Sequence, residues 1–208
     1  NFSIMVLLPS MAAAFTATII SRAIFGRATI FDIPDLQLLP IGYYGIVILV
    51  ALASGLAGVI FNWGLLNIGR FYSLPCFKRP VQKIAFALIC AGILGYFLPE
   101  VLGGGNNLIN HLAKAPVSLQ LLLLFLAGKL IFTLISYGCG VPGGFFLPML
   151  VIGALCGSIC AQILIMFGWI EPAYATNIMV VAMAALFASS VRAPITGTVL
   201  IMEMTASY

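Results

Sequence analysis

Charged residues are scarce in this sequence. Its 208 residues include nine basic and five acidic side chains, so 7% are charged and 63% are hydrophobic. A soluble domain carries about a quarter charged residues, because its surface must face water. The deficit excludes a soluble fold, so most of the outer surface must face lipid or other membrane-buried protein. The small positive net charge is clustered, and it therefore bears on membrane topology rather than on a nucleic-acid partner.

Patterns typical of metal sites and catalytic sites are also missing. His111 is the single histidine, the five cysteines form no C-x-x-C pair, and the five acidic residues are scattered. These residues predict no metal site, no disulfide and no enzyme based on paired carboxylates. The cysteines are expected to act as small apolar residues in packed helices. We therefore expect no catalytic residue, no metal and no cofactor.

The alternation of apolar and polar residues that marks barrel strands is lacking. Stretches such as 119–134 show no period of two, which a transmembrane barrel strand requires. Backbone polar groups in lipid need internal partners, so the sequence predicts an all-α, polytopic membrane domain over residues 1–208. Proline, glycine and polar residues divide it into seven to eight helices, expected at 4–25, 43–71, 81–97, 108–113, 117–136, 145–167, 177–189 and 194–205.

Helix length varies in a way that bears on function. Crossing a bilayer takes roughly 20 residues, and the segments 108–113, 177–189 and 194–205 are shorter. The segment 43–71 is long enough to cross with considerable tilt. Transporters use short and broken helices to build binding sites at the bilayer midplane. Re-entrant packing elements are the alternative interpretation of the short segments.

Two polar loops differ in charge. Four basic residues fall between Arg70 and Lys83, while the loop 26–40 contains Asp32 and Asp35. The positive-inside tendency places 70–83 in the cytoplasm and 26–40 outside. The alternative is that the basic side chains only snorkel from helix ends to headgroups, which needs no sidedness.

Small residues recur at helical spacing at 51–58, at Gly153 and Gly157, and at 182–188. In membranes such residues let helix backbones approach closely. We predict close helix packing at these positions.

Glycine and proline interrupt the apolar pattern at 138–148, where the sequence reads Gly-Cys-Gly-Val-Pro-Gly-Gly-Phe-Phe-Leu-Pro. This composition breaks a helix, and glycine lets the backbone approach an ion without side chains in the way. The helix that follows presents free N–H groups and the positive end of its dipole, which attract an anion without a fixed cation. Such binding is favourable yet weak enough for release, as permeation requires.

The break predicts a specific anion site. The anion is expected at the backbone amides of Gly144, Phe145 and Phe146. Pro148 fits the first turn, where its missing N–H costs no helical hydrogen bond. A glycine hinge between two helices is the alternative interpretation. The full anion-binding set is expected to be Gly144, Phe145, Phe146, Leu147 and Pro148, and the pathway loop to comprise Gly138, Gly140, Pro142 and Gly143.

Three charged residues interrupt apolar segments, and such residues are functional candidates in membranes. Lys129 could raise the local anion potential, but pairing with a carboxylate or snorkelling is favoured. Arg192 precedes a short helix and is expected near an interface or vestibule. Glu203 is interpreted as structural, pairing or capping.

Three ordered motifs resemble those of the CLC family of chloride channels and H⁺/Cl⁻ exchange transporters. The run Gly-Val-Pro-Gly-Gly-Phe-Phe-Leu-Pro at 140–148 is similar to the family's G-x-F-x-P signature. The segment 190–205 resembles R-A-P-L-T-G followed by E-M-T, and Gly-Gly-Gly-Asn-Asn-Leu-Ile at 103–109 resembles the family's G-G-G-x-x-x-I turn. The helix pattern agrees with the family over the whole chain.

The resemblance implies a CLC-like fold fragment, comprising the end of the first inverted repeat and most of the second. It implies that the amides of Phe145 and Phe146 contact the central chloride. It also implies a homodimer in the lipid bilayer, with the helices 4–25 and 194–205 at the interface. The family's gating glutamate, its serine loop and its proton-relay glutamate have no match here and are expected to precede this region, while the pathway tyrosine is expected to follow Tyr208.

The sequence therefore favours selective chloride transport, with chloride as the transported ligand and protons as the second ion of an H⁺/Cl⁻ antiporter. The compact chain, with no regulatory module following, looks bacterial, which implies the inner (plasma) membrane. A chloride channel and a fluoride-exporting CLC subtype are alternatives, although the absence of a polar or acidic insertion in the signature fits chloride better. A non-transporting membrane scaffold is the alternative of a different class.

Overall fold

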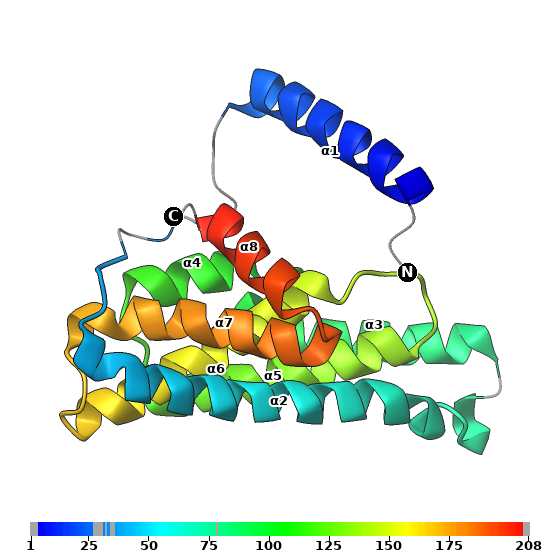
Figure 1. The fold of residues 1–208 in the computed structure, drawn as a ribbon. Coiled ribbons are helices and arrows are strands. Elements are labelled where there is room, and N and C mark those ends of the chain that lie inside the picture. The colour runs from blue at the N-terminus through cyan, green and yellow to red at the C-terminus, as the bar shows by residue number, and fades with distance from the viewer. Residues whose placement is uncertain (1–3, 27–30, 32, 34–35, 78, 206–208) are drawn as a thin grey trace. The chain divides into compact units, whose positions relative to one another are not determined.

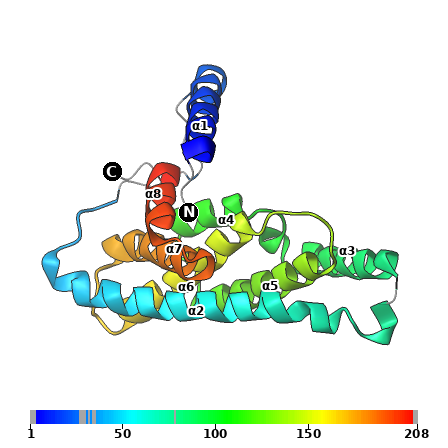
Figure 2. The ribbon, with the colours of Figure 1, turned by 45° about the vertical axis from the view of Figure 1, so that its right-hand side comes forward.

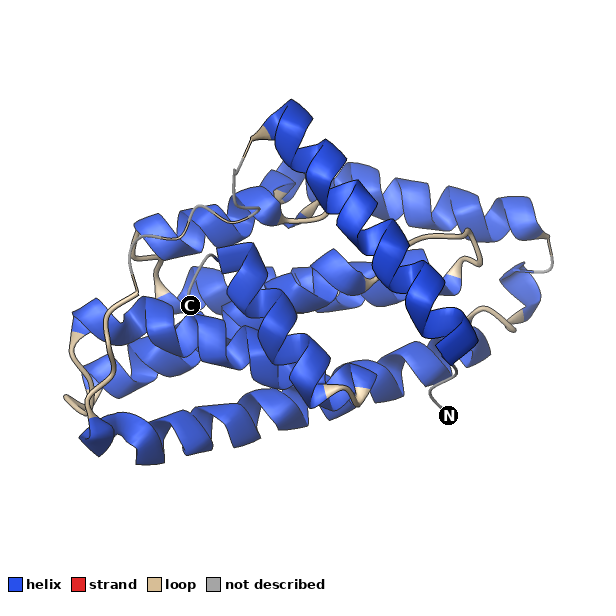
Figure 3. Cartoon of the chain, turned by 45° about the horizontal axis from the view of Figure 1, so that its top comes forward, coloured by secondary structure: helices blue, strands red, loops and turns tan. Residues whose placement is uncertain are grey.

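The computed structural model describes residues 4–26, 31, 33, 36–77 and 79–205. Within these residues every regular element is a helix (Figure 3). The predicted all-α fold is thereby confirmed. The acidic residues of the loop 26–40, Asp32 and Asp35, lie outside the described residues, as does Lys78 of the basic stretch. The chain divides into two compact units, Asn1–Ile30 and Phe31–Tyr208.

The first unit contains one helix, α1 (Ile4–Phe25), with the bounds expected from the sequence. Three of its hydroxyl side chains, Ser10, Thr16 and Thr18, are satisfied within the helix. Thr16 and Thr18 each donate a hydroxyl hydrogen bond, of 2.8 Å, to the carbonyl oxygen four residues earlier. Such hydrogen bonds offset the free-energy cost of placing a hydroxyl group in lipid. Leu7–Phe25 is long and apolar enough to cross a membrane.

The second unit is a bundle of seven α-helices among the described residues (Figure 1). Most boundaries lie within two residues of those expected. Short 3₁₀ turns precede α2, α3 and α7 and follow α3. The helices are α2 (Tyr44–Phe71), α3 (Pro80–Phe97), α4 (Asn106–Lys114), α5 (Leu119–Gly138), α6 (Phe146–Met166), α7 (Ala175–Val191) and α8 (Pro194–Thr205).

The expectation that residues 177–189 form too short a helix to span a bilayer was wrong. The 3₁₀ turn Pro172–Tyr174 runs directly into α7, and together they form a 20-residue apolar segment, Pro172–Val191. The polar residues Thr176 and Asn177 masked this start in the sequence. Six helical segments of the described chain are long and apolar enough to cross a membrane, whereas α8 has 12 residues.

The centre of the second unit is α6, which contacts α2, α4, α5 and α7 (Figure 1). Residues 149–155 of α6 are all buried. The sequence explains this position, because a helix that is apolar on every side has no face for water and packs inside other elements. The first turn of α6, which follows the glycine-rich break, is therefore attached to the most enclosed helix of the unit.

Small residues bring α6 and α7 into close contact, as predicted. A Cβ atom at Gly153 would lie 2.8 Å from Met183 Cα, and one at Gly157 would lie 2.6 Å from Met179 Cα. On the other side of α7, Gly58 of α2 packs against Ser189, and the Ser190 hydroxyl donates to the Gly58 carbonyl at 3.4 Å. Figure 2 shows α2 running along the bundle beside α7 and α5.

Candidate functional site

The helix is interrupted where the sequence predicted. The helix α5 ends at Gly138, α6 begins at Phe146, and residues 140–145 have irregular backbone. Gly140 adopts a φ of 83°, a conformation that glycine accepts without a steric penalty. Phe145 precedes the helix with φ −99° and ψ 2°. The segment 139–145, which we call the break, therefore delivers the chain to the first turn of α6.

The first turn of α6 leaves several backbone N–H groups without an acceptor. Met149 N–H donates to Phe145 O at 3.0 Å and is the first hydrogen bond of the helix. Pro148 carries no N–H. Among the described residues, no hydrogen bond is made by the N–H groups of residues 144–147. Unpaired donors and the positive end of the helix dipole coincide here, which is the arrangement that binds anions.

A cavity of about 420 Å³ opens beside these amides. Its walls come from α5, from the break and from the turn that precedes α4. Lining residues that bear on anion binding are Lys129, Ser136, Gly143, Gly144, Phe145 and Pro148. A second cavity of about 340 Å³ also borders the first turn, and it is lined by Gly103, Gly104, Gly144, Phe146, Leu147 and Pro148.

The structure brings together six of the nine residues that the sequence assigned to the site. Gly143, Gly144, Phe145, Phe146, Leu147 and Pro148 all line one or both cavities. Gly140 and Pro142 lie in the break but line neither cavity. Gly138 is a correction, because it is the last residue of α5 and not part of a loop.

Gly138 serves helix packing. A Cβ atom there would lie 2.7 Å from both Tyr72 Cε2 and Ile68 Cγ1. Tyr72 in turn donates its hydroxyl to the Ile135 carbonyl at 2.9 Å. Desolvation by burial raises the pKa of Tyr72 to about 12, so the hydroxyl keeps its proton and remains a donor. The glycine therefore lets Tyr72 reach the end of α5.

Aromatic contacts fix the side chains on both sides of the first turn. Phe145 packs edge to face against Tyr137, with ring centroids 5.6 Å apart. Phe146 makes the same kind of contact with Phe187 of α7, also at 5.6 Å. These contacts hold the two side chains. Because both side chains are apolar rings, the polar groups that residues 145 and 146 can offer to an anion are their backbone amides.

The triglycine turn 103–105 forms one wall of the site, a contact that sequence reasoning did not predict. A Cβ atom at Gly104 would lie 3.1 Å from Leu147 Cδ1, and one at Gly105 would lie 2.5 Å from Val151 Cγ2. Gly103 and Gly105 adopt φ values of 67° and 88°. Glycine is needed here both for backbone conformation and for close approach to α6. The run of three glycines is visible in the sequence, but the residues of α6 on which it packs lie about forty residues further along the chain.

Alanine substitution separates these two requirements. Gly105→Ala is expected to lower stability by about 2 kcal/mol, because the new methyl group combines a positive φ with a clash against Val151. Gly103→Ala is the matched control. An alanine there is also strained by a positive φ, but its Cβ would have no described atom within 4 Å and so would not clash. Thermal unfolding of the two variants measures the difference. Equal losses would show that the Val151 contact is unimportant.

Lys129 occupies an unexpected position. Its residue exposure is 1%, and its Nζ donates hydrogen bonds of 2.8 Å to the carbonyl oxygens of Val101 and Gly103. The expectation that Lys129 pairs with a carboxylate or snorkels was wrong. Neither partner carbonyl could be inferred from the sequence, since both lie on a different segment of the chain.

The two other embedded charges lie at exposed positions. Arg192 ends α7 in the left-handed region, with φ 60°, and precedes α8. Glu203 is exposed on α8, and no residue of the described chain forms an ion pair with it. Glu203 lies inside the helix rather than at its start, so the expectation of pairing or capping was wrong for the part of the chain that the structure describes.

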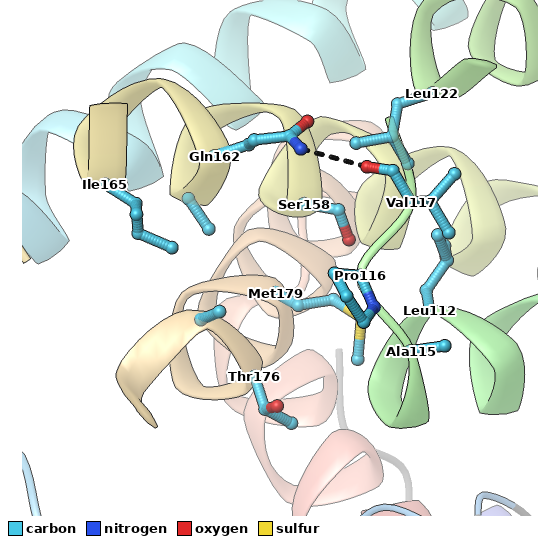
Figure 4. Close-up of a pocket in the computed structure, with 12 residues that line it drawn as sticks. Leu112, Ala115, Pro116, Val117, Leu122, Ser158, Gln162, Ile165, Thr176 and Met179 are labelled. Atoms are coloured by element: carbon cyan, nitrogen blue, oxygen red, sulfur yellow. Dashed lines mark hydrogen bonds between the residues drawn. The ribbon is translucent and has the colours of Figure 1, made fainter. Parts of the chain in front are cut away.

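A separate cavity of about 110 Å³ lies between α6, α7 and the segment that leads into α5 (Figure 4). Gln162 of α6 donates its amide to the Val117 carbonyl at 2.9 Å, while its Oε1 has no hydrogen-bond partner among the described residues. Ser158 and Thr176 add hydroxyl groups to the lining. No residue of the break reaches this cavity, so it is distinct from the candidate anion site.

Comparison with known proteins places these features in a family context. The model of the voltage gated chloride channel family matches residues 1–208. The H⁺/Cl⁻ exchange transporter ClcA of Salmonella agona (strain SL483) is 35% identical over 210 residues, covering 96% of this chain and 44% of the relative. The same-named protein of Vibrio vulnificus (strain YJ016) is 33% identical over 215 residues, covering 100% of this chain and 45% of the relative.

A solved structure gives the same picture of the fold. The crystal structure of a slow cyanobacterial Cl⁻/H⁺ antiporter matches with a TM-score of 0.82 and 30% identity, covering 92% of this chain and 45% of that one. The predicted polytopic, CLC-like helical fold is thereby confirmed. The chain spans less than half the length of each of these relatives.

Proposed function

The chain belongs to the voltage gated chloride channel family, and from this premise we propose that its protein exchanges chloride for protons across a membrane. The relatives described above carry the name H⁺/Cl⁻ exchange transporter, which supports this proposal. The chain itself contributes an anion-binding segment rather than a catalytic centre. We place that segment at the break and the first turn of α6.

One observation supports the anion site above all others. The N–H groups of residues 144–147 have no acceptor among the described residues, and they lie at the start of a buried helix beside a cavity of about 420 Å³. An anion entering the cavity exchanges water for these donors and for the helix dipole. The amides of Phe145 and Phe146 are the proposed ligands, with Gly144 allowing close approach.

The same geometry accounts for release. A backbone amide carries a partial charge, so an anion held by amides is bound less tightly than one in direct contact with an ammonium or guanidinium group in the same low-dielectric site. Permeation requires a site that is favourable enough to fill and weak enough to empty. Pro148 also helps to keep anion binding weak, because it stabilises the first turn of α6 without supplying a further N–H donor.

The assembly and location follow as part of the proposal. We infer a homodimer in the bacterial inner membrane, with α8 at the subunit interface. Exposed apolar side chains on α8 support this, because Ile195 is 81% exposed and Val199 is 54% exposed. Crosslinking of cysteine pairs introduced at Ile195 and Val199 in detergent-solubilised protein tests the dimer. Monomeric protein after crosslinking would contradict it.

Ion-flux measurements on liposomes containing the full-length protein test the transport function. An outward chloride gradient is expected to drive chloride efflux together with proton uptake. Chloride efflux without coupled proton movement would assign a channel instead. Fluoride efflux exceeding chloride efflux would assign the fluoride-exporting subtype, and no flux of any ion would contradict transport.

Bromide in crystals tests the site itself. Bromide substitutes for chloride and scatters anomalously, so a peak is expected within hydrogen-bonding distance of the Phe145 and Phe146 nitrogen atoms. A crystal with bromide elsewhere and none at these amides would contradict the site while leaving transport open.

A further inference from the structure

Among the described residues, the buried Lys129 is the one basic or acidic side chain that lines the 420 Å³ cavity. It comes from the middle of α5, whereas its two hydrogen-bond partners, the carbonyls of Val101 and Gly103, belong to the segment before α4. Gly143, Gly144 and Phe145 line the same cavity from the break. An ammonium group and the amides at the start of α6 that have no acceptor among the described residues therefore border one cavity.

No described carboxylate neutralises this charge. Glu100, which is adjacent in sequence to Val101, is directed instead to His111, with Oε2 and Nδ1 3.6 Å apart. Glu171 and Glu203 are exposed on other elements. Carbonyl oxygens satisfy two donors of the ammonium group and lower its potential locally, but they carry no net charge and so leave the net positive charge in place. At 1% exposure, solvent screens that potential poorly.

We propose that Lys129 sets the anion affinity of the cavity, as a buried cation with which no described carboxylate pairs, and that it favours an anion at the amides of Phe145 and Phe146 without being its ligand. The proposal rests on the function proposed above. The two carbonyl bonds are what make this role physically reasonable. They hold Nζ in place and occupy most of its donors, so the lysine acts through its electric field and does not trap the ion.

Substitution at Lys129 separates charge from architecture. Lys129→Gln keeps amide donors for the two carbonyls and removes the charge, and it is expected to weaken chloride binding by about tenfold, which corresponds to about 1.4 kcal/mol. Lys129→Arg keeps the positive charge. Because the charge is what sets the affinity, this variant is expected to bind chloride within about twofold of the original protein, well short of the tenfold loss that about 1.4 kcal/mol represents. The measurement is isothermal titration of chloride into the full-length protein in detergent.

A purely architectural role predicts the opposite order. The glutamine variant would then bind chloride as well as the original protein does, and this result would overturn the proposal. Arg70→Gln is the matched control, because it removes a positive charge from an exposed position at the end of α2. Its chloride affinity is expected to be unchanged, and a tenfold loss there would also overturn the proposal.

A second substitution covers the case in which Lys129→Gln does not fold. Ser136 lines the same cavity from α5. Ser136→Glu neutralises the cavity charge while Lys129 stays in place, and it is expected to bind chloride about tenfold or more weakly than Ser136→Gln, which has nearly the same size but no charge. Equal affinities of the two Ser136 variants would overturn the proposal. Failure of the proposed function can be distinguished from failure of the Lys129 proposal, because the original protein would then show neither chloride binding nor chloride flux.

Discussion

Replacing Gly157 with leucine is expected to leave little or no folded protein. Even a single Cβ atom there would lie 2.6 Å from Met179 Cα, 2.7 Å from Ala182 Cβ and 3.1 Å from the Ile178 carbonyl oxygen. Two of these neighbours cannot move away by a side-chain rotation, because they belong to the α7 backbone. The helices would have to separate, and the cost is expected to be about 3 kcal/mol or more.

The measurement is the yield of monodisperse protein by size-exclusion chromatography, followed by thermal unfolding. Gly92→Leu is the matched control, because Gly92 lies in α3 and has nothing within 4 Å of an added Cβ. The control makes the same substitution within a membrane helix and is expected to behave like the original protein. Similar yields for the two variants would contradict the close packing of α6 on α7.

Removing the N–H group of Phe146 is expected to lower chloride affinity by about ten- to a hundredfold, the range for a lost hydrogen bond to a charged partner. Incorporation of the α-hydroxy analogue of phenylalanine at position 146 replaces the amide by an ester and keeps the side chain. Because this N–H has no acceptor in the described residues, the helix itself loses no hydrogen bond. Chloride titration and chloride efflux from liposomes both report the change.

Position 119 supplies the control for the ester. Leu119 is the first residue of α5, as Phe146 is of α6, and its N–H likewise makes no hydrogen bond in the described structure. An ester at Leu119 is expected to leave chloride affinity unchanged, because Leu119 lines neither cavity beside the break. Equal effects at 119 and 146 would show that ester chemistry alone perturbs the protein.

Local patterns in the sequence predicted much of this structure. The break was predictable because Gly140, Pro142 and the two following glycines lie within five residues, and this combination strongly disfavours a continuous helix. The start of α6, expected at residue 145 and observed at Phe146, and the position of Pro148 in its first turn followed from the same local rule. The close approach at Gly153 and Gly157 was predictable because small residues at that spacing have few other roles in membrane helices.

Features that depend on distant segments could not be predicted. The partners of Lys129 are two carbonyl groups, and a carbonyl has no distinctive residue type by which a sequence could reveal it. Gly138 looked like part of the loop because it begins the glycine-rich run, yet Tyr72 of another segment decides its role. The triglycine turn was noticed as a motif, but nothing local indicated that it packs on Leu147 and Val151.

The enclosure of α6 has a consequence for how ions could be exchanged. A helix that is buried along residues 149–155 and interlocked with α7 through two glycines cannot rotate or slide without breaking many contacts at once. Under the proposed exchange function, access to either side of the membrane would then be switched by other helices around a stationary α6. The choice of anion and the opening of the anion pathway would in that case depend on different helices, so a mutation could change one without changing the other.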